Sequence, residues 1–442
     1  MLSKNVIFEY LIVFASAILV GVTSTKTDYV ITFLLMFALI LLLLRKKIFL
    51  FVAILMNESL FYFVDPNKIP IINILIILVV FFAVISFKIK RKYYFKNAIL
   101  ILLVISIFEV INSYIINGQP LIIGIYAVKS FCLYLFYFYF IDNYKSIDDL
   151  QSVEKFIIIT GFIASLIYFT QAILYDKMIF LHVDFFNARL GNVRFYTGFT
   201  YVIFSFFLTI SKIFTQKATK WYFLLIAVFE FISIIFVSQT RNFLIGIIIG
   251  LLWIIYIQKK FSKIWFSLAI ILFIIIVIYL GDVSLIKLIY SVYLESVDKS
   301  GTVGFRIKEI EFYWNQIINH PIFGVGIYST KFPESYYITG LVHKYYLSDV
   351  GIIGFIFQTG LIGFIWLVYF ISKIISLIIK VYVKDRDSSL FFSSFMVYCL
   401  ATIFSTFYFG LLNSIIYITV MISMLEIEYK QLYKKDFNWN IK

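Results

Sequence analysis

Four of the seven arginines, Arg189, Arg194, Arg241 and Arg306, stand in or beside polar segments that separate long apolar runs. An arginine carries a planar, permanently charged guanidinium group, which donates paired hydrogen bonds to phosphate or carboxylate oxygens. Lysine would suffice for a purely topological charge, so this choice of residue points to an anionic ligand. The four arginines therefore suggest phosphate binding, with a diphosphate as the leading candidate.

A second candidate group is His343-Lys344-Tyr345-Tyr346, which directly precedes another long apolar run. A neutral imidazole accepts a hydroxyl proton near neutral pH, so His343 is a candidate general base. Lys344, Tyr345 and Tyr346 would bind the polar groups of a substrate around it. A single histidine at the edge of an apolar run is also commonly structural, and both interpretations stay open.

The segment 304–328 is expected to open with an amphipathic helix. Ile310, Trp314 and Ile317 recur at i, i+4 and i+7 and form an apolar stripe. An adjoining, more polar face carries Arg306, Glu309, Tyr313 and Gln316. This helix either lies at a membrane interface, anchored by its aromatic residues, or presents Arg306 to a lipid-linked phosphate.

Pro321 is expected to end this helix, and Gly324-Val325-Gly326 follows it. Glycine tolerates backbone conformations that other residues avoid, and it lets the main chain approach another group closely. We therefore expect a turn at Gly324 and Gly326 where the backbone meets a ligand.

The elements that position these residues must be membrane-spanning helices. Of 442 residues, 62% are hydrophobic and 14% are charged, too few to cover a soluble protein of this size. A spanning helix needs about 20 mainly apolar residues. We expect one all-α transmembrane domain over 1–442 with about 14 spans, within a range of 12–14. The expected spans are 6–23, 29–44, 48–64, 71–87, 97–116, 121–141, 153–174, 194–211, 221–238, 242–257, 263–281, 347–372, 389–409 and 411–428.

The distribution of positive charge predicts the orientation of these spans. Alternate loops divide the 38 lysines and arginines into sets of 25 and 12, with Lys129 inside a span. Loops rich in Lys and Arg stay in the cytoplasm, so the larger set and both termini are expected there. The net charge of +14 then reflects topology, and no nucleic acid is expected as a partner. Two long segments fall outside: 175–193 and the helical loop 282–346.

Charged and sulfur-containing residues inside the spans suggest structural roles. Glu109 and Lys129 flank a tight hairpin at similar depth and are expected to form an ion pair, or otherwise to serve a substrate or proton pathway. Glu230 is expected to hydrogen-bond between helices. Cys132 and Cys399 lie in apolar runs without metal-ligand spacing, and neither a metal nor a cofactor is expected.

Three motifs together resemble the O-antigen polymerase and O-antigen ligase superfamily of bacterial membrane glycosyltransferases. The first, S-x-[ST]-R, is Ser238-Gln239-Thr240-Arg241. The second, R-x7-W-x6-P-x2-G-x-G, matches Arg306, Trp314, Pro321, Gly324 and Gly326. The third, H-x2-[YF]-L followed by G-x2-G, matches His343, Tyr346, Leu347, Gly351 and Gly354.

The resemblance implies a metal-independent, C-type membrane glycosyltransferase that uses undecaprenyl-diphosphate-linked oligosaccharides. We expect a polymerase that joins repeat units of O-antigen, capsule or exopolysaccharide on the outer face of the bacterial cytoplasmic membrane. Arg241 and Arg306 would bind the donor diphosphate, Arg189 or Arg194 the second carrier, and His343 would act as general base.

Two other functions stay open. An O-antigen ligase of the same superfamily would pass finished polysaccharide to another acceptor. A lipid-linked oligosaccharide flippase or other transporter would belong to a different class, although the sequence shows no convincing internal repeat of the kind many transporters have. A chain-length regulator and a flippase are possible protein partners of a polymerase.

Overall fold

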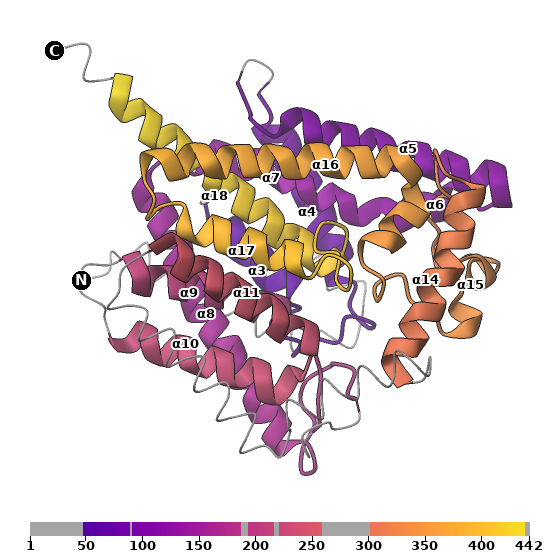
Figure 1. Cartoon of the computed structure of the whole chain (residues 1–442), viewed down its shortest axis with the longest axis horizontal. Helices are drawn as coiled ribbons and strands as arrows, with labels where there is room; N and C mark the ends of the chain where they lie inside the picture. The colour runs from indigo at the N-terminus through magenta and orange to yellow at the C-terminus, as the bar shows by residue number, and fades with distance from the viewer. Residues whose placement is uncertain (1–46, 89–90, 187–192, 216–220, 259–300, 438–442) are drawn as a thin grey trace.

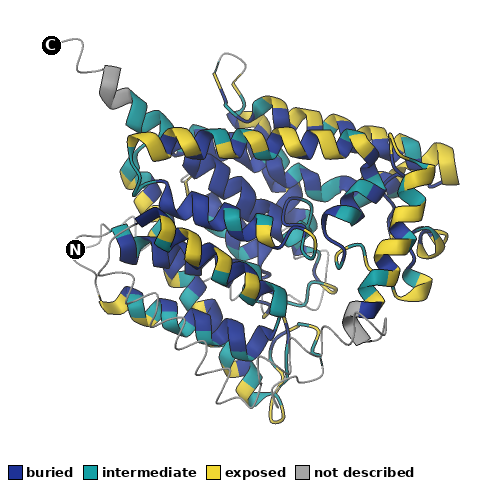
Figure 2. Cartoon of the chain, viewed as in Figure 1, coloured by how far each residue is buried: buried dark blue, intermediate teal, exposed yellow. Residues whose placement is uncertain are grey.

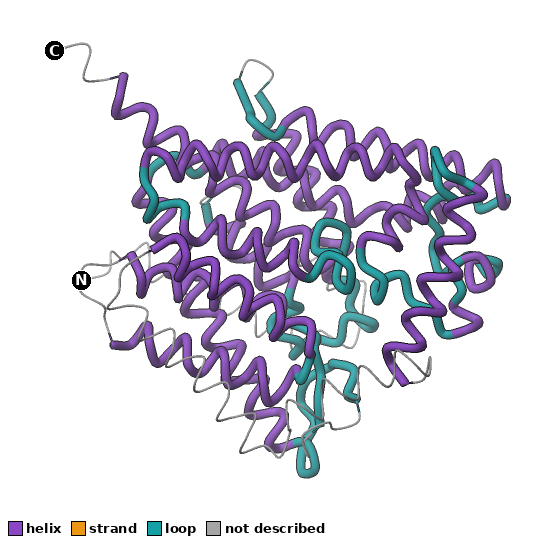
Figure 3. The backbone as a smooth tube through the Cα atoms, in the orientation of Figure 1, coloured by secondary structure: helices purple, strands orange, loops and turns teal. Residues whose placement is uncertain are grey.

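The computed structural model describes residues 47–88, 91–186, 193–215, 221–258 and 301–437. The expected spans 6–23, 29–44 and 263–281 lie outside these ranges, as does Arg189. Over the described ranges the chain is all-helical, and Figure 3 shows helices joined by loops. Within these ranges Phe186 and Arg194 form an isolated antiparallel β-bridge.

The elements follow one another along the chain as a series of helices (Figure 1). They are α3 (Ile48–Asn57), α4 (Ile71–Ser86), α5 (Lys96–Asn117), α6 (Leu121–Val128), α7 (Phe136–Asn143), α8 (Ile147–Leu174), α9 (Phe199–Thr215), α10 (Trp221–Ser233), α11 (Arg241–Gln258), α14 (Gly301–Asn319), α15 (Ser335–Ile338), α16 (Ile352–Lys384), α17 (Leu390–Ala401) and α18 (Leu412–Phe437). Shorter helical turns are η1 (Lys129–Leu135), η2 (Ile234–Ser238) and η3 (Leu341–His343).

Seven helical units in the described part of the chain are long and apolar enough to cross a membrane. Four further apolar helices, α3, α4, α9 and α17, have 10–17 residues. An all-helical protein with several membrane-spanning helices is therefore confirmed, whereas the count of about 14 spans is not. One reason is local: the apolar run 48–64 stops being α-helical after Asn57, because Ser59, Leu60, Phe61 and Tyr62 all adopt positive φ.

The bundle exposes apolar side chains on its surface and pairs polar groups in its interior, as expected for a protein surrounded by lipid. Figure 2 shows α5 and α16 with exposed residues along one flank, while α7 and much of α18 are buried. On α5 the exposed side chains include Val104 and Ile107. Buried polar groups pair between helices, as where Ser205 donates to Glu230 across 2.6 Å. This contact agrees with a helix-bridging role for Glu230.

The ion pair expected between Glu109 and Lys129 is wrong. Glu109 accepts a hydrogen bond from Asn112 at 3.2 Å, and Lys129 donates to Asn73 at 2.6 Å. The α-helix after the hairpin ends at Val128, and the chain continues as the 3-10 helix η1. Lys129 thus bonds across to α4, while Glu109 bonds within its own helix, and the two side chains do not pair.

The described part of the expected outer loop 282–346 lies at one end of the helix bundle. Figure 1 shows α14 and α15 near the start of α16, and the end of α18 at the opposite end. The C-terminal parts of α16 and α18, whose sequences include Lys380, Lys384 and Lys430, lie at the end of the bundle opposite α14. This arrangement separates the segment with Arg306 and His343 from a strongly basic part of the chain.

Candidate active site

Arg241 is the first residue of α11 and follows a tight turn. The turn begins where η2 ends at Ser238, and Gln239 adopts a left-handed conformation with φ 47°. The Thr240 hydroxyl donates to the Ser238 carbonyl at 3.0 Å, and the Thr240 carbonyl accepts the Phe243 N–H at 3.1 Å. The motif thus places Arg241 at the N-terminus of an 18-residue helix, where the helix dipole favours an anion.

Backbone contacts on both sides of Arg194 hold this residue beside the turn that precedes Arg241. The Phe195 N–H donates to the carbonyl of Val237 in η2 at 3.2 Å. On the other side, Arg194 pairs with Phe186 in the isolated bridge, and its guanidinium carbon lies 5.6 Å from the centre of the Phe186 ring. These contacts anchor Arg194 beside the turn that leads to Arg241.

Arg194 and Arg241 form a pair of like charges, called here the arginine pair. Burial lowers the pKa of Arg194, and the positive charge of Arg241 lowers it further, while Tyr196 has the opposite effect. The Nε atoms of both arginines are buried and have no hydrogen-bond partner in the described part of the chain. Two neighbouring cations with unused donors can accommodate a diphosphate, whose oxygens accept charge-assisted hydrogen bonds.

Arg306 lies on α14, which turns its polar face toward the protein. Glu309 and Tyr313 on that face are buried, and the Tyr313 hydroxyl donates to the Thr339 carbonyl at 2.9 Å. Ile310 and Trp314, from the apolar stripe, are 37% and 53% exposed. The helix therefore presents its apolar stripe outward, and Trp314 is not part of the face that packs inward.

His343 ends η3, in a loop that rests on aromatic rings of α14. The ring of His343 lies 6.4 Å from that of Phe312 and 5.5 Å from that of Tyr345, centre to centre. Tyr345 contacts Phe312 and also Phe305, at 5.5 and 5.3 Å. Lys344 has φ 61°, so the chain turns sharply directly after the histidine. The imidazole is exposed while its backbone is held by a compact turn.

Tyr346 connects this loop to α14 and approaches the arginine pair. Its N–H donates to the Oε1 atom of Glu309 at 3.0 Å, while its side chain is 50% exposed. Tyr196, two residues after Arg194, lies within electrostatic range of both Tyr346 and Asp349. Asp349 in turn interacts with Glu309 on α14. Electrostatic contacts thus link the neighbourhoods of the arginine pair, α14 and the His343 loop.

Gly324 and Gly326 approach protein backbone rather than open space. The N–H groups of Val325 and Gly326 donate to the carbonyls of Phe357 and Gln358 in α16, each at 3.0 Å. A Cβ atom on Gly324 would lie 2.6 Å from the Gln358 backbone. The close approach expected at this motif occurs, but its partner is a break in α16 at Gly360, where φ is 59° and ψ is −155°.

This contact fastens the segment after α14 to α16. The Leu361 N–H donates back to the Pro321 carbonyl at 2.9 Å, on the other side of the break. Gly351 and Gly354 of the third motif also face backbone, at Ile403 and Leu347. The spacing of the glycine motif is therefore explained by packing that holds the loops with Arg306 and His343.

The sequence did not single out Glu309, Tyr196 or Asp349 as site residues. The spacing of Arg306 and Glu309, three residues apart on a helix, placed both on one face. Tyr196 and Asp349 carry no comparable signal, because the contact between their loops depends on how distant helices pack. Arg189 lies outside the described residues, so its predicted role stays a prediction.

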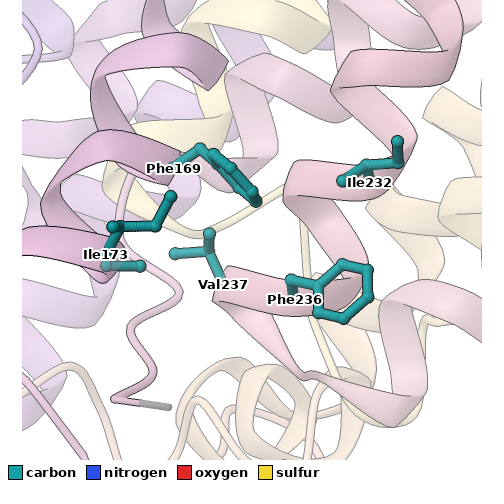
Figure 4. A pocket seen from close by; sticks show the side chains of 6 residues that line it. Phe169, Ile173, Ile232, Phe236 and Val237 are labelled. Carbon is teal, nitrogen blue, oxygen red and sulfur yellow. The ribbon is translucent and has the colours of Figure 1, made fainter. Parts of the chain in front are cut away.

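An apolar pocket of about 270 Å³ lies between α8 and the α10–η2 unit (Figure 4). Its lining comprises Phe169, Ala172, Ile173, Ile232, Phe236 and Val237. Val237 is also the residue whose carbonyl binds the Phe195 N–H beside Arg194. An apolar space thus adjoins the backbone that carries the arginine pair.

Residues 223–368 match the family model described as O-antigen ligase. This stretch runs from α10 into α16 and contains Arg241, Arg306 and His343. No curated protein matches the chain. The match confirms the resemblance drawn from the three motifs: over residues 223–368 the chain is similar to the O-antigen ligase family, within the O-antigen polymerase and O-antigen ligase superfamily.

Proposed function

We propose that the protein is a polysaccharide polymerase that joins undecaprenyl-diphosphate-linked oligosaccharide repeat units on the outer face of the cytoplasmic membrane. The observation that carries this proposal is the arginine pair, in which the Nε atoms of Arg194 and Arg241 are buried without hydrogen-bond partners. Like charges held together repel each other, and a diphosphate would replace this repulsion with attraction. The family match supports a lipid-linked oligosaccharide as the source of that diphosphate.

The reaction would proceed by displacement at the sugar of the donor. A hydroxyl oxygen of the acceptor sugar forms a bond to the anomeric carbon, and the bond from that carbon to the diphosphate oxygen breaks. The hydroxyl proton passes to His343, and the diphosphate leaves on its lipid. Arg241 and Arg306 would stabilise the departing negative charge, so that the proposal requires no metal ion.

The remaining candidate residues would bind substrate around this centre. Arg194 would share the donor diphosphate with Arg241, and Arg189 would contact the carrier of the second repeat unit. Lys344, Tyr345 and Tyr346 would contact sugars beside His343, and exposed Trp314 would contact sugar or the membrane interface. Gly324 and Gly326 would act indirectly, through their backbone contacts with α16.

The apolar pocket provides a place for part of a lipid chain. It is lined by hydrocarbon side chains and adjoins the backbone beside Arg194. A polyprenyl diphosphate has a charged head joined directly to an apolar chain, and this substrate would need both environments next to each other. We assign the pocket to the first isoprene units of a carrier.

The proposal includes an orientation of the chain in the membrane. The basic loops favour the cytoplasm, which would leave both termini inside and α14 outside. This side is where Arg241, Arg306 and His343 would meet substrates that have already crossed the membrane.

Alanine variants of Arg306 and His343 test the assigned roles in cells. We expect both variants to insert normally and to produce short or single repeat units instead of long polymer, as measured by gel separation of the polysaccharide. Lys308→Ala is the matched control, since Lys308 is an exposed cation on the same helix as Arg306. Full-length polymer from normally inserted Arg306→Ala and His343→Ala variants would disprove these roles.

The ligase is the second candidate, because the matching family model is described as O-antigen ligase. Deletion of the gene separates the two activities. Loss of a polymerase leaves single repeat units on the final acceptor, whereas loss of a ligase leaves finished polymer on undecaprenyl diphosphate.

A further inference from the structure

Glu309 lies between the two groups that the proposed function uses on α14. Arg306, Glu309 and Phe312 follow one another at intervals of three residues, so their side chains are neighbours along the helix surface. Phe312 contacts the ring of His343. Glu309 therefore stands between a cation assigned to the diphosphate and the aromatic support of the candidate base.

The Glu309 carboxyl group is almost completely buried, at 1% exposure. Its Oε1 atom accepts the N–H of Tyr346, three residues after His343. Its Oε2 atom is buried without a hydrogen-bond partner in the described part of the chain. A buried polar atom without a partner destabilises the fold, so this side chain is not optimised for stability.

A glutamine would serve a purely structural role at this position equally well. Its amide oxygen could accept the Tyr346 N–H, and it would avoid burying a charge. The chain has glutamate at this position instead, which indicates that the negative charge of the Glu309 carboxylate has a function. The opposite charge within electrostatic range is that of Arg306 on the same helix.

We propose that Glu309 is a positioning residue whose carboxylate aligns the two sides of the active site. Oε1 fixes the His343–Asp349 segment through Tyr346, and the negative charge orients Arg306 toward the leaving diphosphate. This inference rests on the proposed glycosyl transfer. It requires the ionised form of Glu309 during the reaction.

The surroundings of Glu309 oppose its ionisation. Burial raises the pKa of Glu309 to about 7; the hydrogen bond from Tyr346 lowers it, Asp349 raises it and Arg306 lowers it. Tyr313 belongs to the same cluster, since it interacts electrostatically with Glu309, Asp349 and Tyr345. Stability and activity should therefore respond to pH in opposite directions.

The direction for stability follows from proton binding. The folded protein keeps the Glu309 proton up to pH of about 7, whereas the ordinary pKa is 4.5. The stability contributed by this group is complete below that ordinary value and is lost as the pH rises through about 7. Activity should show the reverse, rising as the carboxylate forms.

Three variants of the full-length protein in detergent test the inference. Glu309→Gln keeps the acceptor oxygen and removes the charge, and Glu309→Asp keeps the charge on a shorter side chain. Glu334→Gln is the control, since Glu334 is an exposed acid in the same outer segment. The substrate is the lipid-linked oligosaccharide fraction extracted from cells that lack this gene.

We expect Glu309→Gln to lower kcat by roughly 10²-fold with little change in KM, as misplaced reacting groups do. Above neutral pH its Tm should equal or exceed that of the wild type, and the midpoint of the acidic limb of kcat should move. Glu309→Asp should recover part of the rate. Wild-type kcat in Glu309→Gln, an unchanged acidic midpoint, or a fall in Tm that accounts for the lost rate would each overturn the inference.

The result also separates this inference from the proposed function. If Arg306→Ala and His343→Ala lose transfer while Glu309→Gln retains it, only the role of Glu309 is wrong. If none of these variants changes the rate, the proposed site itself is wrong.

Discussion

Arg241 lies close enough to Arg194 for its charge to lower the pKa of that guanidinium group. The two residues belong to different loops, which meet because the Phe195 N–H binds the Val237 carbonyl. A protein gains no stability by placing two arginines together with buried, unpaired Nε atoms. The arrangement is understandable if the missing partner is an anionic substrate.

Neutralising one member of the arginine pair should lower activity without lowering stability. We expect Arg194→Gln to leave the free energy of unfolding unchanged or to raise it by about 0.2–1 kcal/mol, because a like-charge repulsion disappears. Polymer formation should nevertheless fall strongly. Thermal unfolding of the purified protein and polymer length in cells measure the two effects.

A double variant provides the control for this interpretation. Once Arg194 is neutral, Arg241→Gln should bring no further gain in stability, since the repulsion is already gone. Equal and additive gains from the two single substitutions would show that the charges act independently.

Gly324→Ala should destabilise the fold strongly. The added Cβ would lie 2.6 Å from the Gln358 backbone, and φ at this residue is +67°. Gly118→Ala is a matched control, since Gly118 has φ +72° but nothing within 4 Å of the same position. The control should lose only about 1 kcal/mol from backbone strain.

The yield of folded protein and its Tm distinguish these two glycine variants. A similar loss at both positions would mean that the contact between Gly324 and α16 contributes little.

Filling the apolar pocket should impair substrate binding. Ala172 lines this pocket, and Ala172→Phe would place a ring in its space. Under the proposed function, KM for extracted lipid-linked repeat units should rise several-fold with kcat largely retained, which is the behaviour of lost ground-state binding. Leu225→Phe on the exposed flank of α10 is the control and should behave like the wild type. An unchanged KM in Ala172→Phe would remove the pocket from the proposal.

The sequence predicted the elements that depend on local pattern. The apolar runs located α5, α8, α11 and α16, because a helix that meets lipid must be apolar over its whole length. The expected spans 221–238 and 242–257 leave only a very short connection before Arg241, and the structure has a tight turn there. The runs that ended in left-handed turns, as at Ser59–Tyr62, could not be recognised from composition.

The packing between distant segments was not predictable in the same way. The pattern placed Gly324 in a close approach, but only the fold identifies the α16 backbone as its partner. Equal distance from a hairpin suggested a pair between Glu109 and Lys129, but Lys129 bonds to Asn73 of α4 and Glu109 to Asn112 of its own helix. Burial of Glu309 likewise depends on where the loop after His343 docks.

Binding of the lipid carrier to the arginine pair tests the central claim most directly. Purified wild-type protein should show a higher Tm with undecaprenyl diphosphate than with undecaprenol, the same chain without phosphates. The Arg194→Gln/Arg241→Gln double variant should lose most of that difference while remaining folded. An equal rise in Tm for the wild type and the double variant would contradict the claim that these two arginines bind the diphosphate.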